Sequence, residues 1–358
     1  MVDSMFEARV NRLFSLMDDR GLDGLLVADE NNMLYLTGFS GGSLLLIPRF
    51  GDRLLYVYSV NYEAAKAEAF GVEVELVGRG EDVLAKISDA LRDAGIKSLG
   101  FDSLRASTYL KLRNANPNVD LKDAGEILWS LRKVKDQSEI EIMRFAAELT
   151  SRGMNRAAET IRAGVSEREV AAEIEYEMRR GGSDGVAFDT IVASGPRSAY
   201  PHGGCGDRRI RRGDLVVVDI GAKYRSYCSD LTRTFIIGEP SPKSLRIYKT
   251  VMEAQNLALK ALRAGVKACE IDRIARDYIS EAGYGEYFVH GLGHGVGLDV
   301  HEPPALSPKS RDILAEGYVV TVEPGIYIPG FGGVRIEDTV LILKDRAEKL
   351  TSSPIPQY

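Results

Sequence analysis

Apolar residues recur at helical spacing over the first 20 positions of the chain. Phe6, Val10, Leu13, Phe14 and Met17 fall on one side of a helix drawn through this segment. A stripe of this kind predicts an amphipathic helix that buries its apolar side. The segment also carries acidic residues and lacks a continuous apolar region, so it does not have the pattern of a secretory signal peptide.

The next hundred residues alternate short apolar runs with helical patterns. The predicted strands are residues 22–28, 43–48 and 53–59, and the predicted helices are residues 63–70 and 82–94. Each of these two helices is followed by a glycine, Gly71 or Gly95, which is a common helix stop. Strands that alternate with helices predict a small α/β domain at the start of the chain.

The second half has longer helices and longer β-rich segments. Helical patterns cover residues 131–163, 167–180 and 242–264, and the predicted strands are residues 215–220, 232–237, 318–322 and 334–343. Mostly hairpin-like strands mixed with helices predict an α+β domain. A chain of 358 residues suits two domains. We place them at residues 1–125 and 126–358, with the boundary near residues 123–129.

Charge and cysteine content narrow the class of protein. The formal net charge is −6 and the isoelectric point is near 5.5, which argues against a nucleic-acid partner. A run of arginines at residues 208–212 is flanked by Asp207 and Asp214, so we interpret it as a solvated turn. The three cysteines are scattered, which favours reduced thiols in a reducing compartment. No apolar stretch approaches the roughly 20 residues of a membrane span. These patterns predict a cytoplasmic protein without a membrane or nucleic-acid partner.

Histidine is the most informative residue type. The chain has only four histidines, and all lie in its second half: His202, His290, His294 and His301. Three of them fall within HGLGHGVGLDVH, and each of the four stands in a glycine-rich loop or beside a proline. Glycine lets the backbone approach a ligand closely. This placement favours a functional site over isolated core or surface histidines.

Four acidic residues lie within apolar segments or directly beside them. Asp219 follows LVVV, Asp230 opens the next predicted strand, Glu323 ends YVVTV, and Glu337 lies within GGVRIEDTVLIL. A buried carboxylate is costly unless it is paired, hydrogen-bonded or bound to metal. Two antiparallel strands joined by a loop could bring Asp219 and Asp230 together. Period-two alternation puts Arg335, Glu337 and Thr339 on one strand face. Any one of these acids alone could also be salt-bridged to a neighbour.

The charges of this set balance those of two divalent cations. Two Asp, two Glu and one neutral His supply four negative charges. Oxygen-rich ligand sets favour Mn²⁺, with Co²⁺ and Zn²⁺ also possible. Two such ions can deprotonate a bridging water near neutral pH. The set therefore predicts metal-assisted hydrolysis, with a metal-bridging hydroxide as nucleophile.

Six motifs in the second half, in order, resemble the pita-bread metallopeptidases of the prolidase and aminopeptidase P branch. They are SGPRSAYPHG, VVVDIGAKY, SDLTRTF, HGLGHGVGLDVHEPP, VVTVEPGIYIPG and GGVRIEDT. NNMLYLTGFSG in the first half and LRKVKDQSEIEIMRFAAELT after it also resemble segments of that branch. The resemblance implies a pita-bread catalytic domain (α+β) preceded by a smaller α/β creatinase-type domain. It also implies an enzyme that hydrolyses Xaa-Pro bonds.

Matching the motifs residue by residue implies roles for nine side chains. The implied ligands of the two metal ions are Asp219, Asp230, His294, Glu323 and Glu337, with Asp230 and Glu337 bridging. Glu323 would also accept a proton from the bridging water. His202 and His301 would orient the substrate and stabilise the tetrahedral intermediate. Arg335 would hydrogen-bond within the site, contact substrate or form a plain salt bridge, and His290 would line the substrate pocket.

Two activities fit this branch, and other members of the fold are alternatives. A prolidase cuts Xaa-Pro dipeptides and must recognise a free proline carboxylate, for which an arginine is the natural partner. In HEPPALSPKSR, Ala305 stands near the place where prolidases carry that arginine. This favours aminopeptidase P, which cuts Xaa from longer Xaa-Pro peptides, or an enzyme with both activities, over a strict Xaa-Pro dipeptidase. Methionine aminopeptidases, creatinase and non-catalytic pita-bread binding modules fit less well, because each lacks the first domain or the metal set. The resemblance further implies a homodimer.

Overall fold

The computed structural model describes residues 2–358, with side chains from residue 5 onward. The chain divides into two compact units, Met1–Arg132 and Lys133–Tyr358. The predicted boundary at residue 125 falls at the first residue of α6 (Gly125–Arg132). This helix belongs to the first unit because it contacts α1 (Val2–Asp19) and buries Ile127, Leu128 and Leu131.

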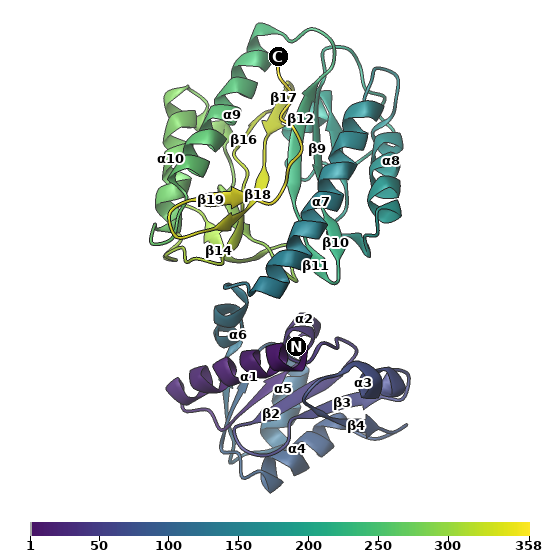
Figure 1. The fold of residues 1–358 in the computed structure, drawn as a ribbon, viewed down its shortest axis with the longest axis vertical. Helices are drawn as coiled ribbons and strands as arrows, with labels where there is room; N and C mark the ends of the chain where they lie inside the picture. Colours follow the sequence, from purple (N-terminus) through teal and green to yellow (C-terminus); the bar gives the residue numbers. More distant parts are fainter. Residues whose placement is uncertain (1) are drawn as a thin grey trace. The chain divides into compact units, whose positions relative to one another are not determined.

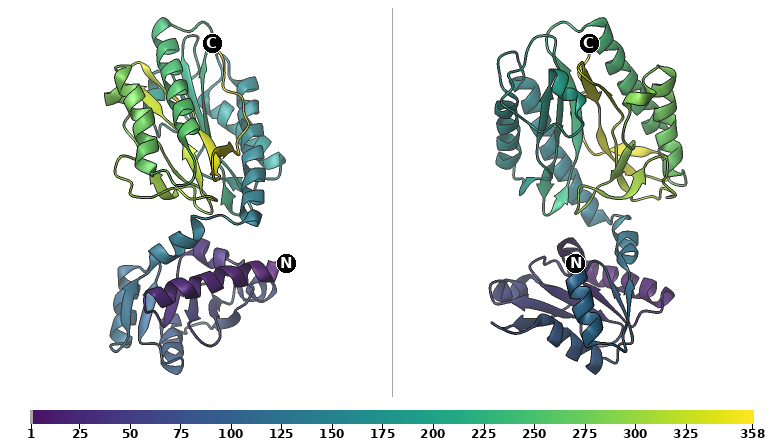
Figure 2. Two further views of the ribbon diagram at one scale, coloured as in Figure 1. Left: turned by 60° about the vertical axis from the view of Figure 1, so that its left-hand side comes forward. Right: turned by 180° about the vertical axis from the view of Figure 1, so that it is seen from behind.

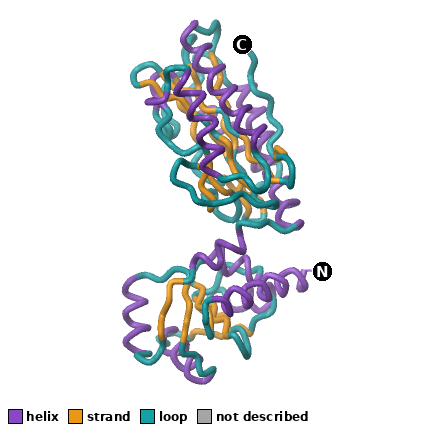
Figure 3. Tube along the Cα trace, turned by 90° about the vertical axis from the view of Figure 1, so that its left-hand side faces the viewer, coloured by secondary structure: helices purple, strands orange, loops and turns teal. Residues whose placement is uncertain are grey.

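The first unit is a six-stranded mixed sheet with helices packed around it (Figure 3). Its strand order is β4-β3-β2-β1-β5-β6, with parallel pairing at β3–β4, β1–β5 and β5–β6. Its strands are β1 Gly24–Val27, β2 Leu44–Pro48, β3 Leu54–Tyr58, β4 Glu73–Val77, β5 Ser98–Phe101 and β6 Asp120–Asp123. Its other helices are α2 Glu30–Thr37, α3 Tyr62–Glu68, α4 Val83–Asp93 and α5 Ala106–Ala115. The predicted α/β character is confirmed.

The second unit packs strands between two pairs of helices (Figures 1 and 2). The helices are α7 Gln137–Thr160, α8 Glu167–Arg180, α9 Pro242–Ala261 and α10 Ala268–Glu281. One apolar core joins α7 and α8 to β8 and β9, and another joins α9 and α10 to β15, β16, β17 and β18. The strands therefore meet in the middle of the unit, with a helix pair outside each core.

The strands of the second unit form four small sheets. Their orders are β11-β10-β7, β12-β9-β8, β14-β13-β15-β18-β19 and β16-β17. The strands are β7 Gly185–Val186, β8 Ile191–Ser194, β9 Leu215–Ile220, β10 Ala222–Tyr224, β11 Tyr227–Cys228, β12 Leu231–Ile236, β13 Gly293–Gly295, β14 Glu302–Leu306, β15 Val319–Val322, β16 Gly325–Ile328, β17 Gly332–Arg335, β18 Asp338–Ile342 and β19 Ala347–Lys349. The predicted α+β character is confirmed.

Two predicted elements are interrupted. The helical pattern over residues 131–163 is broken between α6 and α7, because Asp136 caps the start of α7. The Asp136 carboxylate accepts from the Glu139 N–H, and the Glu139 carboxylate accepts from the Asp136 N–H. The predicted strand over residues 334–343 is broken at Ile336 and Glu337. There the chain leaves the two-stranded sheet of β17 and enters the five-stranded sheet as β18.

Candidate metal centre

A strand pair brings the two aspartates of the candidate site together. β9 carries Asp219, and β12 returns antiparallel beside it with Thr232 opposite Asp219. Asp230 is the residue immediately before β12, two positions before Thr232. The connection is a hairpin of β10 and β11 that turns at Arg225 and Ser226, both with positive φ. This left-handed two-residue turn suits a tight hairpin, and it explains why eleven positions can separate two neighbouring carboxylates.

The segment from Arg335 to Thr339 lies along β12 and adds a third carboxylate. The Glu337 N–H donates to the Thr232 carbonyl at 3.1 Å, and the Thr232 hydroxyl donates to Glu337 Oε2 at 2.6 Å. The Arg335 Nε donates to the same hydroxyl, and the Thr339 hydroxyl donates to the Asp230 carbonyl at 2.7 Å. The three side chains predicted to share a face thus all contact the β12 segment, even though the strand itself is interrupted.

β13 and β15 bring His294 and Glu323 to the same place. His294 Nε2 lies 3.2 Å from Glu323 Oε1 and 3.7 Å from Asp230 Oδ2. The Glu323 N–H donates to the Leu292 carbonyl at 2.8 Å. Gly293 allows this approach, because a Cβ there would lie 2.1 Å from the Thr321 carbonyl oxygen.

The donor set fits a divalent cation. One ligand atom from each of Asp230, His294 and Glu337 lies within 4.8 Å of the others. Among the described residues, three buried carboxylate oxygens have no hydrogen-bond partner: Asp219 Oδ1, Asp230 Oδ1 and Glu337 Oε1. Buried acceptors of this kind are rare unless something unseen satisfies them. Carboxylate oxygens with one imidazole nitrogen are ligands for Mn²⁺, Co²⁺ or Zn²⁺.

Electrostatics also favour positive charge at this point. Burial, together with the charges of Glu337 and Asp219, raises the pKa of Asp230 well above its ordinary value. Burial and the charges of Glu323 and Asp219 likewise raise the pKa of Glu337. Burial alone would raise the pKa of Glu323, but the hydrogen bond and charge of His294 outweigh it and lower that pKa to about 2. Without cations, burial and mutual repulsion therefore disfavour the charged forms of Asp230 and Glu337.

A cavity of about 820 Å³ in the second unit opens onto these groups. All nine predicted site residues line it: His202, Asp219, Asp230, His290, His294, His301, Glu323, Arg335 and Glu337. The His301 ring lies 4.3 Å from the His294 ring, measured between centroids. The rest of the lining includes the apolar side chains of Phe188, Ile191, Val289 and Ala305. The sequence patterns therefore identified residues that the fold gathers around one cavity.

Arg335 hydrogen-bonds within the site, as one of its predicted alternatives states. Its Nη2 forms an ion pair with Asp219 Oδ2, and its Nη1 donates to the Tyr327 hydroxyl at 2.8 Å. The same Nη1 donates to the Pro201 carbonyl at 3.3 Å, beside His202. Arg335 is 3% exposed, so its charge is balanced inside the protein and is not free for solvent.

Tyr327 is a site residue that the sequence reasoning missed. Its hydroxyl lies 2.9 Å from His290 Nε2, and His290 Nδ1 lies 2.7 Å from the Gly291 carbonyl. Nδ1 donates to the carbonyl, because a carbonyl oxygen can only accept, and burial lowers the pKa of His290, which favours its neutral form. The Tyr327 hydroxyl then donates to Nε2. The available signal was a tyrosine within VVTVEPGIYIPG, but only the fold shows what it contacts.

Comparison with known proteins identifies the family. The model of metallopeptidase family M24 matches residues 141–344, and the creatinase/prolidase N-terminal domain matches residues 9–134. The chain belongs to metallopeptidase family M24. The predicted architecture, a creatinase-type α/β domain followed by a pita-bread α+β catalytic domain, is confirmed.

Several known proteins match this chain over nearly its whole length. A curated Xaa-Pro dipeptidase of Pyrococcus horikoshii is 43% identical over 96% of this chain and 97% of its own. The crystal structure of the prolidase from that organism has a TM-score of 0.92 and covers 98% of this chain and 100% of its own, at 43% identity. The structure of an X-Pro aminopeptidase from Thermotoga maritima has a TM-score of 0.89 and 40% identity, covering 97% of this chain and 98% of its own.

Two further sequence expectations concern membrane-spanning helices and the cysteines. None of the described helices is long and apolar enough to cross a membrane. Cys205 and Cys269 are free thiols, and the Cys228 thiol donates to the Leu298 carbonyl at 3.6 Å.

Proposed function

We propose that this M24 metallopeptidase hydrolyses the peptide bond before proline, with two divalent cations held by Asp219, Asp230, His294, Glu323 and Glu337. The observation that carries the proposal is the set of unpartnered buried carboxylate oxygens on one cavity wall. The relatives named Xaa-Pro dipeptidase and prolidase support the choice of substrate.

The charge of the ligand set supports two ions. Four carboxylates and one neutral imidazole match the charge of two divalent cations. Mn²⁺ and Co²⁺ suit this oxygen-rich set, and Zn²⁺ is a further candidate. Ions held there would supply Lewis-acid chemistry that makes water nucleophilic near neutral pH and polarises the scissile carbonyl.

The chain's own side chains divide the remaining work. Glu323 is placed to take the proton of the attacking water, since its carboxylate faces the cavity beside His294. His202 and His301 line the cavity from other segments and would stabilise the charge that develops on the substrate oxygen. The role proposed for Arg335 is to hold Asp219, Tyr327 and the Pro201 carbonyl in place.

The substrate proposal also rests on what proline lacks. An Xaa-Pro bond is a tertiary amide without an N–H, and its ring fixes φ. A pocket shaped for a ring does not need that N–H. Phe188, Ile191, Val289 and Ala305 supply apolar surface for the ring and for the preceding side chain, and His290 lines the same pocket.

Dipeptides are the first candidate substrate, because relatives that match nearly the whole chain carry the names Xaa-Pro dipeptidase and prolidase. This reverses the preference for aminopeptidase P that the sequence alone gave. Longer Xaa-Pro peptides remain a second candidate for a specific reason. Ala305 lines the cavity, and the one arginine of its described lining, Arg335, is paired with Asp219. A free proline carboxylate would therefore lack an unpaired guanidinium at this wall.

The test uses metal-free protein reloaded with Mn²⁺ or Co²⁺. Hydrolysis of Met-Pro, Met-Pro-Ala and the control Met-Ala is followed in parallel. Cleavage of Met-Pro alone establishes a strict dipeptidase, whereas faster cleavage of Met-Pro-Ala establishes aminopeptidase P. If both proline peptides stay intact in either metal, or Met-Ala is cut equally well, the proposed specificity is wrong.

The quaternary state and the compartment stay predictions. A homodimer is expected to give about twice the chain mass of 39.3 kDa in light scattering. A monomer with full activity would contradict it. The predicted cytoplasmic location is checked by fractionating cells of the source organism and following the protein by immunoblot.

A further inference from the structure

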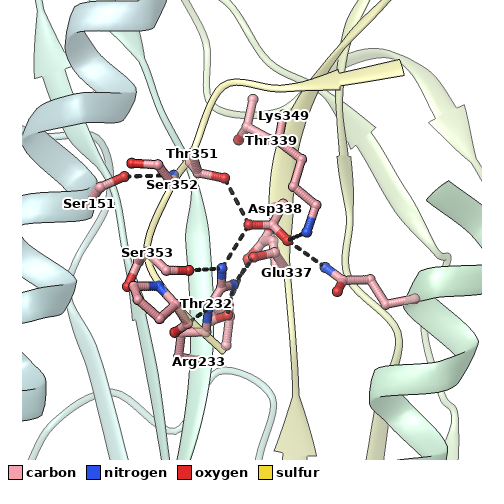
Figure 4. A network of polar contacts seen from close by, with 12 residues as sticks. Ser151, Thr232, Arg233, Glu337, Asp338, Thr339, Lys349, Thr351, Ser352 and Ser353 are labelled. Atoms are coloured by element: carbon pink, nitrogen blue, oxygen red, sulfur yellow. Dashed lines mark hydrogen bonds and ion pairs between the residues drawn. The ribbon is translucent and has the colours of Figure 1, made fainter. Parts of the chain in front are cut away.

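A buried ion pair lies directly behind the candidate ligand Glu337 (Figure 4). Arg233 on β12 and Asp338 on β18 approach to 2.8 Å, and their side chains are 1% and 0% exposed. Neither residue is among those that line the cavity. The pair therefore does not contact substrate, although Asp338 is the next residue after Glu337.

The Arg233 guanidinium links the metal centre to the end of the chain. Its Nη1 donates to the carbonyls of Thr232 and Glu337. Its Nη2 donates to the Ser353 carbonyl at 2.6 Å, and its Nε donates to the Pro354 carbonyl at 3.3 Å. One side chain thus fixes the backbone of a candidate ligand and the backbone of the C-terminal segment at the same time.

The Asp338 carboxylate collects donors from four separate elements. Oδ1 accepts from Arg233 and from the Thr351 hydroxyl at 3.0 Å. Oδ2 accepts from Gln255 of α9 at 3.0 Å and from Lys349 of β19 at 2.7 Å. Figure 4 shows these contacts converging on the carboxylate from several directions. These four donors together hold the Asp338 carboxylate in one position.

Stability alone does not explain this arrangement. Apolar residues of similar volume often stabilise a core as well as a buried ion pair does, because desolvating two charges is costly. The pair does one thing that apolar residues cannot. Arg233 hydrogen-bonds the Glu337 carbonyl, while Thr232 donates to the Glu337 carboxylate at 2.6 Å. Partners that orient ligands in this way commonly set metal affinity.

We propose that Arg233 and Asp338 are positioning residues for the metal centre, and that the C-terminal segment 351–354 belongs to the same hydrogen-bond network. Through the Glu337 backbone they hold its carboxylate in the binding geometry. Loosening this network weakens metal binding while the unit stays folded. The inference rests on the proposed metal site, so metal binding by the unaltered protein is measured first.

The experiment titrates metal-free protein with Co²⁺ and follows the visible absorption of bound Co²⁺. If the unaltered protein binds no Co²⁺, the proposed metal site fails, and this inference falls with it. With binding established, Asp338→Asn and Arg233→Lys are compared with Asp214→Asn. This control breaks a different ion pair, the partly buried Arg208–Asp214, beside the far end of β9. Circular dichroism establishes that each variant is folded at the titration temperature.

Asp338→Asn and Arg233→Lys are expected to raise the Kd for Co²⁺ roughly 10- to 100-fold. Asp214→Asn should leave it within about twofold. Thr351→Val, which exchanges a hydroxyl for a methyl of similar shape, should raise the Kd severalfold and decides the matter if the other two variants do not fold. A Kd unchanged in the folded variants, or raised equally in Asp214→Asn, overturns the proposal.

Discussion

Glu167 offers a sharp test of how the fold holds the His202 loop. It lies in the first turn of α8 and its side chain is 0% exposed. Its Oε1 accepts from the Ser194 N–H at 2.8 Å and from the Ser194 hydroxyl at 2.7 Å. Its Oε2 accepts from the Gly206 N–H at 2.9 Å and from Arg197 Nε at 3.2 Å. One carboxylate therefore joins both ends of the loop that carries His202.

The expected cost of Glu167→Ala follows from these bonds. A hydrogen bond to a charged group contributes about 1.5–3 kcal/mol net. Arg197 is 36% exposed, so its bond is left out because solvent can replace it. Three remaining bonds at the lower value give about 4–5 kcal/mol in the free energy of unfolding. For a unit the size of residues 133–358 this corresponds to a fall of roughly 8–20 °C in Tm. Glu167→Gln keeps one acceptor oxygen and should lose about half as much.

The assay is urea unfolding of metal-free protein, followed by far-UV circular dichroism and by tryptophan fluorescence. Trp129, the chain's single tryptophan, lies in α6 of the first unit, so the fluorescence transition should not move. The matched control is Glu169→Ala. Its carboxylate is exposed and caps the same helix, so its loss should destabilise the unit much less than the loss of Glu167 does. A Glu167→Ala variant no less stable than Glu169→Ala would refute the argument.

Three other predictions concern the same unit. The pKa values of Asp230 and Glu337 are raised in the metal-free fold above their ordinary values of 3.8 and 4.5. Their protonation therefore contributes its full stabilisation when the pH is below those ordinary values, and this contribution is lost as the pH rises through the raised pKa values. Metal binding competes with protonation of these two carboxylates, so calorimetry in buffers of different ionisation enthalpy should show proton release and an affinity that rises with pH. Lys135→Met should lower the free energy of unfolding by about 3–5 kcal/mol, because Lys135 pairs with Glu302 at 3.0 Å and both side chains are 1% exposed. Adding Glu302→Gln should recover at least half of that loss in chemical unfolding. No recovery would exclude the broken pair as the cause. Ala305→Arg should raise kcat/KM for Met-Pro relative to Met-Pro-Ala, and an unchanged ratio would show that residue 305 does not face the proline carboxylate.

The residues around the candidate metal ions were accessible to sequence reasoning because each breaks a local pattern. Asp219 is the polar residue of an otherwise apolar β9, and Glu323 follows the last residue of β15. The predicted bounds of β9 and α8 agree with the structure for the same reason, since apolar runs and the Ser166 cap mark their ends. Local pattern could not give Tyr327 or Thr232, whose importance lies in what they contact across the fold.

Asp338 shows why alternation has a limit in this fold. Alternation places Glu337 and Asp338 on opposite faces, and an acid opposite the cavity face would ordinarily be assigned to solvent. Here every residue of β18 is buried. The face away from the cavity lies under Gln255 of α9 and the segment around Thr351, which supply the donors that Asp338 needs. Because α9 is distant in sequence from β18 and the C-terminal segment returns to it only after β19, only the folded chain shows that both faces of this strand are interior. The charge of Asp338 is tolerated there because four donors meet it, including two cations, Arg233 and Lys349.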